Sequence, residues 1–262
     1  ETIKVRRGGR IHPLELSPSV KARIEYGRTQ KQQFFARELG RASDDGQQLL
    51  SDFRAYVDEI QPTRKRAFVD NLQDLAEDPE RPMLNGKIAV LYADGNSFSK
   101  ILRGFLENHP ADHQTIYESW DKTLQDYRRA FLRSLLDIQR GHRSIQSQAW
   151  LTSGGRTRLE TLLWGGDEFT LVVPAWLGWE VISVFFEESS RWEFTYPEDN
   201  KEGAVPLTHA LGMVYCSASA PINEMTGIAK TLAEDIKKKS SKRVLTTLLR
   251  TRCSSLLTKL LS

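Results

Sequence analysis

The stretch Lys87-Ile88-Ala89-Val90-Leu91-Tyr92-Ala93-Asp94-Gly95-Asn96-Ser97 decides the fold. Its first seven residues form a short run with too little polar alternation for a half-exposed strand. We therefore predict a central strand that is buried on both faces. The run ends at Asp94 and gives way to a helical pattern over 98–107. A carboxylate at this point projects from a strand end, close to the free N–H groups at the start of the helix.

A second acidic motif lies at Gly165-Gly166-Asp167-Glu168-Phe169, between two extended runs, 158–164 and 169–173. Two strands that flank a Gly-Gly turn predict a β-hairpin. If this hairpin pairs with the first strand, Asp167 and Glu168 lie beside Asp94. Each motif alone is also an ordinary turn, but together they predict a site for Mg²⁺ or Mn²⁺, because Mg²⁺ takes carboxylate oxygens together with substrate phosphates.

The rest of the chain completes an α+β pattern. Further helices are expected at 110–138, 176–188 and 221–239, and further strands at 191–196 and 207–217. We predict a ferredoxin-like palm over residues 85–243, in which a mostly antiparallel sheet carries helices on one face. Residues 1–84 are expected to be a mainly helical region that opens with a basic loop or edge strand. Residues 244–262 are a basic tail rich in leucine and serine.

These motifs resemble the GGDEF and palm superfamily of nucleotide cyclases and polymerases. Leu91-Tyr92-Ala93-Asp94-Gly95-Asn96-Ser97-Phe98 and Gly165-Gly166-Asp167-Glu168-Phe169 are most similar to the palm of the large polymerase-like subunit of type III CRISPR effectors and its stand-alone relatives. The resemblance covers about residues 86–242. It implies a nucleotidyltransferase that binds divalent metal through Asp94, the Gly95 carbonyl, Asp167 and Glu168, with Glu168 also orienting the attacking hydroxyl.

The resemblance also implies a nucleotide-binding set. The stretch Ala229-Lys230-Thr231-Leu232-Ala233-Glu234-Asp235-Ile236-Lys237 is similar to the last palm helix of the family, whose lysine contacts triphosphate. That role would fall to Lys237, although a basic helix end is also favoured by the helix dipole alone. The remaining nucleotide-binding positions that the resemblance implies are Asn96, Ser97, Phe98, Gly165 and Gly166.

The branch of the superfamily decides the nucleotide. Diguanylate cyclases usually carry Arg where this chain has Trp164, and their inhibitory Arg-x-x-Asp motif would fall on 158–161, where Thr161 replaces the Asp. CRISPR-type palms tolerate the longer insertion between the two motifs, but they commonly have Asp at the position of Glu168. We favour an ATP-using cyclase that makes a cyclic oligonucleotide in antiviral-type signalling. A diguanylate cyclase that uses GTP, and a catalytically silent nucleotide-binding scaffold or sensor, are the alternatives.

Composition bounds the setting of the protein. Hydrophobic residues make up 39% and charged residues 27% of 262, a globular balance. Because there are only two cysteines, and neither a signal peptide nor a transmembrane run is found, a cytoplasmic location is expected. Because the chain begins with Glu1 rather than Met, we expect residues upstream.

Expected partners follow from charge and from the chemistry of cyclisation. Residues 237–262 hold eight Lys or Arg and no Asp or Glu, a pattern typical of a solvated tail. Binding of nucleic acid through this tail and Arg6, Arg7 and Arg10 lacks support, since no aromatic side chains interleave with the cations of the tail. Cyclic products generally need two facing substrate sites, so the nucleoside triphosphate site is expected to face a second copy or a partner palm.

Overall fold

The computed structural model describes residues 2–7, 10–15, 17–19, isolated positions up to Glu38, and then 68–139, 147–196 and 203–240. Most of the helical region expected between 19 and 67 therefore lies outside the described residues, as does the tail 244–262. The basic opening, expected as a loop or edge strand, is an antiparallel hairpin of β1 (Thr2–Arg7) and β2 (Arg10–Glu15).

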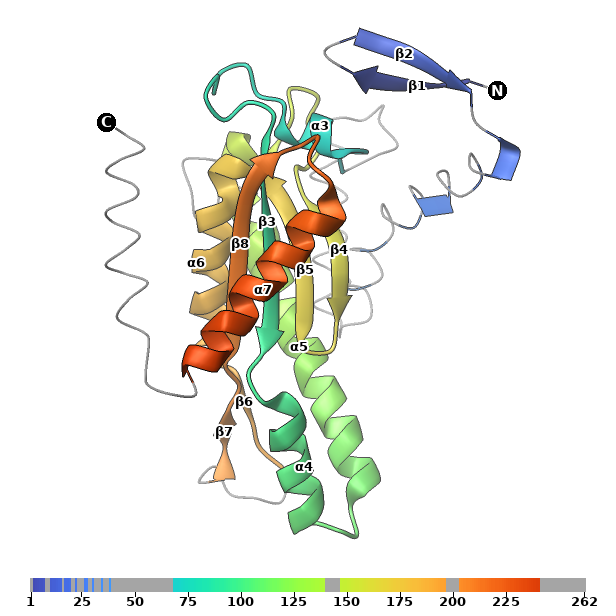
Figure 1. The fold of residues 1–262 in the computed structure, drawn as a ribbon. Helices are drawn as coiled ribbons and strands as arrows, with labels where there is room; N and C mark the ends of the chain where they lie inside the picture. The colour runs from blue at the N-terminus through green and yellow to red at the C-terminus, as the bar shows by residue number, and fades with distance from the viewer. Residues whose placement is uncertain are drawn as a thin grey trace.

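The central sheet is antiparallel throughout (Figure 1). Its strands, in spatial order, are β4 (Glu160–Gly165), β5 (Glu168–Pro174), β3 (Lys87–Gly95) and β8 (His209–Ser217). The expected hairpin is formed by β4 and β5, and β5 pairs with β3, which meets the condition on which the predicted metal site depends. A separate two-stranded ribbon, β6 (Glu193–Phe194) with β7 (Val205–Pro206), is shorter than the strand expected at 191–196.

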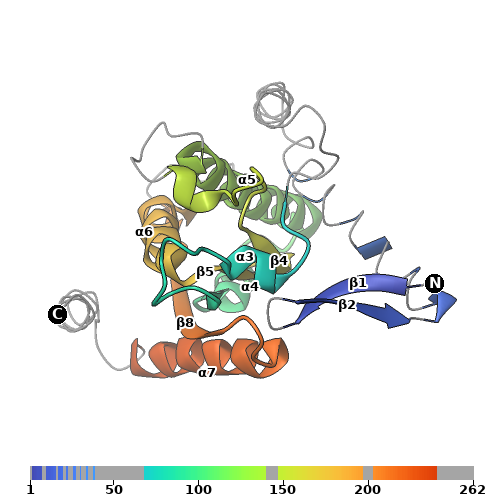
Figure 2. The ribbon, with the colours of Figure 1, turned by 90° about the horizontal axis from the view of Figure 1, so that it is seen from above.

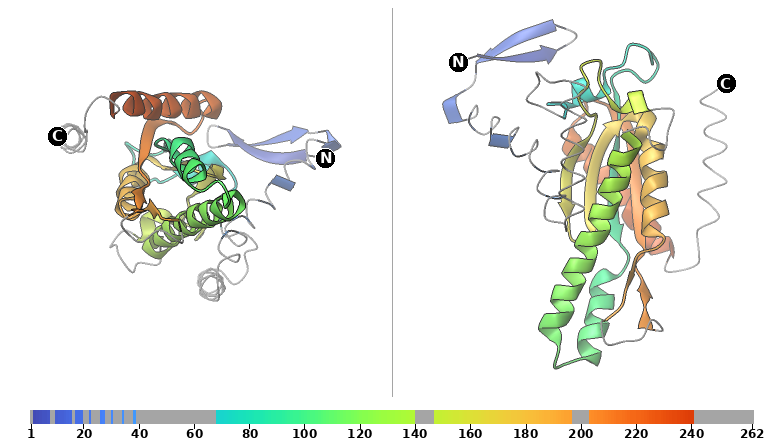
Figure 3. Two further views of the ribbon diagram at one scale, coloured as in Figure 1. Left: turned by 90° about the horizontal axis from the view of Figure 1, so that it is seen from below. Right: turned by 180° about the vertical axis from the view of Figure 1, so that it is seen from behind.

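Helices cover both faces of this sheet (Figures 2 and 3). They are α3 (Leu72–Ala76), α4 (Phe98–Asn108), α5 (His113–Gln139), α6 (Gly178–Ser189) and α7 (Ile222–Ser240), with short 3₁₀ turns η1 (Ser147–Trp150) and η2 (Ala175–Leu177). The α+β class and the antiparallel sheet are confirmed. The expectation of helices on one face is corrected, because α7 lies on the face opposite α5 and α6.

The burial of β3 explains this arrangement. Alternate side chains of a strand point to opposite faces, and both sets are apolar here. Ala89, Leu91 and Ala93 belong to the large core beneath α4, α5 and α6. Val90 and Tyr92 face the other way, Val90 into a smaller cluster near α3 and Tyr92 into a cluster with Ala residues of α7. A strand that is apolar on both faces needs cover on both, so α7 is required opposite α5 and α6.

Small residues let α7 approach the sheet closely. Ala229 and Ala233 of α7 are fully buried against the sheet. A Cβ added to Gly212 of β8 would lie 1.9 Å from the carbonyl oxygen of Ala229. Since that oxygen belongs to a helix backbone, it cannot swing aside as a flexible side chain would. Glycine at 212 is therefore a condition for seating α7.

The packed body extends to the N-terminal side of residue 85, where the palm was expected to begin. Phe68 is buried in the large core and Val69 in a second one. The Arg156 guanidinium, just before β4, makes ion pairs with Asp70 at 3.1 Å and with Asp74 of α3 at 2.9 Å. None of the helices within these described ranges combines the length and apolarity that crossing a bilayer requires.

The seating of α7 can be tested with two glycines. Gly212→Ala should lower the free energy of unfolding by about 3 kcal/mol, because the new methyl group meets helix backbone. Gly227→Ala, on α7 itself, meets nothing within 4 Å and should stabilise by up to about 1 kcal/mol through helix propensity. Urea denaturation of both variants measures this. A Gly212→Ala protein as stable as the wild type would contradict the close packing described here.

Candidate active site

The two acidic motifs meet at one end of the sheet. Asp94, the penultimate residue of β3, lies opposite Glu168, the first residue of β5. Directly opposed residues on paired strands point to the same face, so both carboxylates lie on the side of α7. The backbone N–H of Gly95 donates to the carbonyl oxygen of Asp167 at 3.2 Å. This bond ties the end of β3 to the hairpin tip.

The hairpin between β4 and β5 is closed by a two-residue turn. Gly165 pairs with Glu168, which leaves Gly166 and Asp167 as the two turn residues. Gly166 has a φ of +55°, in the left-handed region that side chains disfavour. The guanidinium of Arg128, on α5, donates to the carbonyl oxygen of Gly166. An arginine from the other face of the sheet thus fixes the turn, and nothing in the sequence singled out this residue.

Lys237 of α7 reaches the same strand end. Its Nζ lies 2.5 Å from Asp94 Oδ2 and donates to the carbonyl oxygen of Gly95 at 2.7 Å. Both acceptors belong to the predicted metal-binding set. The family resemblance implies a triphosphate contact for Lys237, and in this structure its ammonium pairs with the carboxylate of Asp94.

Glu168 is held by Tyr92, a residue outside the predicted site. The Tyr92 hydroxyl donates to Glu168 Oε1 at 2.9 Å. Burial raises the pKa of Tyr92, and so do the hydrogen bond to Glu168 and the charge of Asp94, so the phenol stays protonated as a donor. The Lys230 ammonium lies 5.6 Å from the centre of the Tyr92 ring. Tyr92 lies two residues before Asp94 and therefore on the same face of the strand. This two-residue spacing is the feature of the sequence that could have placed Tyr92 at the site.

Asp167 differs from the other two acids in its surroundings. Together with Glu168, it lines a small pocket on the α5 side whose other residues include Arg128, Trp192 and His209. Burial raises the pKa of Asp167, and the charges of Asp94 and Glu168 raise it further, whereas Lys237 lowers it. A positive charge placed near this carboxylate would favour its ionised form.

The start of α4 serves partly as structure. The Asn96 N–H donates to the Thr208 carbonyl oxygen at 2.8 Å, and the Asn96 side-chain amide donates to Thr208 Oγ1 at 3.1 Å. Ser97 has a φ of +61° and makes no side-chain cap. The Phe98 ring is buried, in edge contact with Trp120. Any nucleotide contact predicted for Phe98 therefore falls to its backbone N–H, one of the groups that a helix start leaves without an intrahelical partner.

The donor set fits a hard divalent cation in part. Within the residues that the structure describes, no group of three or more His, Cys, Asp or Glu side chains could hold a metal ion. However, Asp94 and the Gly95 carbonyl already bind a cation, the Lys237 ammonium. Carboxylate and carbonyl oxygens are the ligands that hard cations take, and Mg²⁺ usually completes its shell with phosphates and waters. Asp94 and Gly95 therefore suit a metal ion that arrives with a triphosphate.

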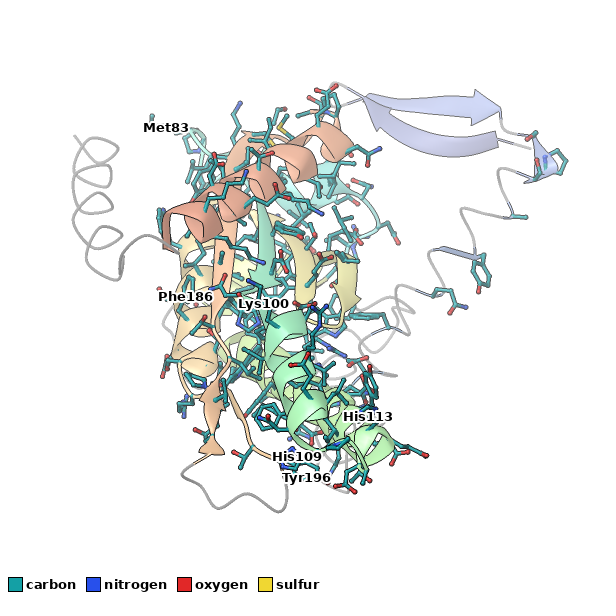
Figure 4. All side chains as sticks on the ribbon, turned by 60° about the horizontal axis from the view of Figure 1, so that its bottom comes forward. Met83, Lys100, His109, His113, Phe186 and Tyr196 are labelled. Atoms are coloured by element: carbon teal, nitrogen blue, oxygen red, sulfur yellow. The ribbon has the colours of Figure 1, made fainter. Side chains whose placement is uncertain are left out.

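His109 and His113 lie at the connection between α4 and α5. His109 Nδ1 lies 3.0 Å from the Phe105 carbonyl oxygen, and His113 Nε2 lies 3.0 Å from the Leu106 carbonyl oxygen. Figure 4 shows both histidines at the far end of the α4–α5 pair, with Tyr196 beside His109. Both rings therefore contact backbone carbonyl oxygens.

No protein-family model and no curated protein matches the chain. Solved structures that resemble it include a diguanylate cyclase and several GGDEF domains. Diguanylate cyclase SiaD of Pseudomonas aeruginosa, solved with its activator SiaC, is 15% identical over 85% of this chain and 75% of its own, with a TM-score of 0.37. The GGDEF domain of DgcB from Caulobacter crescentus, solved with c-di-GMP, is 15% identical over 68% of this chain and 94% of its own, with a TM-score of 0.36. The FimX GGDEF domain of P. aeruginosa is 12% identical over 72% of this chain and 88% of its own, with a TM-score of 0.37.

His209 lies beneath the site in an aromatic cage. Its ring makes edge contacts with Phe98, Phe185 and Trp192, with centroids 4.9–5.3 Å apart. Burial lowers the pKa of His209 from 6.5 to about 3, with a smaller contribution from Lys237. The folded protein therefore keeps this imidazole neutral over a pH range in which the unfolded chain protonates it.

This difference predicts a pH dependence of stability. The contribution of His209 is present above pH 6.5 and is lost as the pH falls toward 3. The free energy of unfolding should fall by up to about 1.4 kcal/mol per pH unit in that window. His209→Phe, which keeps an aromatic ring, should flatten the slope, whereas His113→Gln should not. Urea titrations from pH 4 to 7 measure it, and an unchanged slope in His209→Phe would disprove the assignment.

Proposed function

We propose that the chain binds a nucleoside triphosphate with Mg²⁺ or Mn²⁺ and joins nucleotides as a nucleotidyltransferase of the cyclase type. The observation that carries this proposal is the cation held by Asp94 and the Gly95 carbonyl, beside Glu168 and Asp167. Two further carboxylates next to an occupied cation position provide more negative charge than one ammonium balances. A divalent ion and its triphosphate would correct that excess.

The residues of the chain have separate roles in this reaction. Asp94 and the Gly95 carbonyl would hold the metal ion, with Asp167 or Glu168 as further ligand. The metal ion, when bound, lowers the pKa of a coordinated hydroxyl and balances charge on the phosphates. Glu168, which Tyr92 fixes in place, would orient the attacking sugar hydroxyl. The N–H groups at the start of α4 would receive phosphate oxygens.

The proposal also includes which nucleotide is used and whether two palms act together. ATP is favoured over GTP on the sequence resemblance, namely Trp164 before the glycines and Thr161 in place of the inhibitory Asp. A cyclic product would need a second palm, from another copy of the chain or from a partner. Each palm would supply one triphosphate, and the hydroxyl of one nucleotide would attack the α-phosphate of the other. The bond between the α-phosphorus and the oxygen that bridges to the β-phosphate would break, pyrophosphate would leave, and the hydroxyl proton would pass to solvent. Phosphoryl transfer needs mainly such positioning together with charge compensation.

A second candidate is a palm that binds nucleotide without turnover. Two contacts favour it, because Asp94 is already paired with Lys237 and Glu168 with Tyr92. An acid whose partners lie within the protein has less need of a metal ion. This protein would then act as a scaffold or sensor.

Turnover separates the two candidates. The purified protein is incubated with each α-labelled nucleoside triphosphate and Mn²⁺, and products are separated by chromatography. We expect a cyclic or oligomeric product from ATP, and Asp94→Asn should reduce its rate at least about a hundredfold, since it removes a charge that stabilises the transition state. Asp235→Asn is the matched control, because this α7 carboxylate is half-exposed and lies 3.8 Å from the Lys238 ammonium rather than at the end of β3.

Each outcome has one meaning. Product from GTP alone would replace the ATP preference with the diguanylate reaction. Bound triphosphate with no product from any nucleotide would favour the silent palm. An Asp94→Asn protein as active as wild type would refute the proposed site.

A further inference from the structure

The position of Lys237 raises a question about how metal enters the site. Its ammonium contacts the two oxygens that the proposed function assigns to the metal ion, Asp94 Oδ2 at 2.5 Å and the Gly95 carbonyl oxygen at 2.7 Å. Oxygen ligands lie about 2.0–2.1 Å from Mg²⁺. A metal ion on the same two oxygens would occupy nearly the same space as Nζ. Two cations cannot share that space, so the lysine and the metal ion exclude each other.

The surroundings make this ammonium more than a surface ion pair. The side chains of Lys237 and Asp94 are 25% and 18% exposed, so solvent and salt screen their attraction only in part. Asp167 and Glu168 add two more carboxylates at the same strand end. Removing the ammonium without a replacement would leave partly buried negative charges unpaired, which is costly. The lysine should therefore leave only when another cation arrives.

The lysine also has a place to go. Its ammonium sits on a flexible four-carbon stem, which can turn without moving the helix that carries it. A triphosphate bound beside the metal ion would supply anionic oxygens within reach of the same strand end. The withdrawn ammonium would then balance phosphate charge, and the total charge of the site would stay nearly even.

From this geometry we infer that Lys237 is the resident cation of the metal position and that a divalent ion enters only as Lys237 moves onto the triphosphate. The inference rests on the proposed function, since it takes the same oxygens as the metal site. It makes metal and triphosphate binding mutually dependent. Free metal ions alone would bind weakly, and the palm would stay in a neutralised resting state until its nucleotide arrives.

The test is a pair of titrations on Lys237→Met. Mn²⁺ alone is titrated and followed by the EPR signal of the free ion, and Lys237→Met should bind Mn²⁺ about tenfold more tightly than wild type, because no ammonium competes. The α,β-methylene analogue of ATP is then titrated at saturating Mn²⁺, and the same variant should bind it about tenfold more weakly. A lysine with only a structural role would not shift the two affinities in opposite directions.

Matched variants complete the design. Lys238→Met removes the neighbouring charge, whose side chain is 74% exposed, and should leave both affinities unchanged. Lys237→Gln keeps hydrogen-bond donors for the two oxygens without the charge, and it takes the place of Lys237→Met if the latter does not fold. Circular dichroism checks the fold of each variant.

Asp94→Asn distinguishes the failure of this inference from the failure of the proposed function. Asp94→Asn is made in the wild type and in Lys237→Met. If Lys237→Met binds Mn²⁺ no more tightly than wild type, and Asp94→Asn abolishes Mn²⁺ binding in both backgrounds, the resident-cation inference is wrong and the metal site stands. If Asp94→Asn leaves Mn²⁺ binding unchanged in both, the site itself is wrong and the inference fails with it.

Discussion

The burial of β3 on both faces is the constraint on which the rest of the structure depends. A strand with apolar side chains up and down cannot leave either face to water, so the sheet needs α5 and α6 on one side and α7 on the other. Gly212 allows the close approach of α7. The same approach carries Lys237 to the end of β3, where Asp94 lies. The packing of the core thus positions the charged groups of the site.

Charge compensation organises that site. Three acids meet at one strand end, and each is treated differently: Asp94 is paired with an ammonium, Glu168 accepts a hydrogen bond from Tyr92, and Asp167 is half-buried with a raised pKa. Such unequal surroundings separate the acids chemically, although the sequence presents them as equivalent carboxylates. The arrangement suits a place where one cation can be exchanged for another, and the resting and nucleotide-bound states would differ mainly in which cation is present.

The sequence predicted the parts that local pattern controls. The apolar run of β3, the Gly-Gly hairpin and the helix after Pro221 all lie within a few residues of their predicted bounds. Asp94 also lies opposite Glu168, which follows from the pairing of the hairpin with β3. Side chains that act over long sequence distances were missed. Arg128 reaches Gly166 from a helix that begins far before the hairpin, and no local pattern marks it among the basic residues of α5. The predicted burial of β3 on both faces already requires helices on both faces of the sheet. The expectation of helices on one face only was inconsistent with that burial.

We propose that Asp94 and the Gly95 carbonyl hold a metal ion together with a triphosphate. Crystals grown with Mn²⁺ and a non-hydrolysable ATP analogue, measured at the manganese absorption edge, test it most directly. We expect an anomalous peak in contact with the Asp94 carboxylate and the Gly95 carbonyl, with Lys237 on the phosphates. A bound analogue whose manganese lies away from Asp94, or Lys237 still paired with Asp94 beside bound nucleotide, would contradict it.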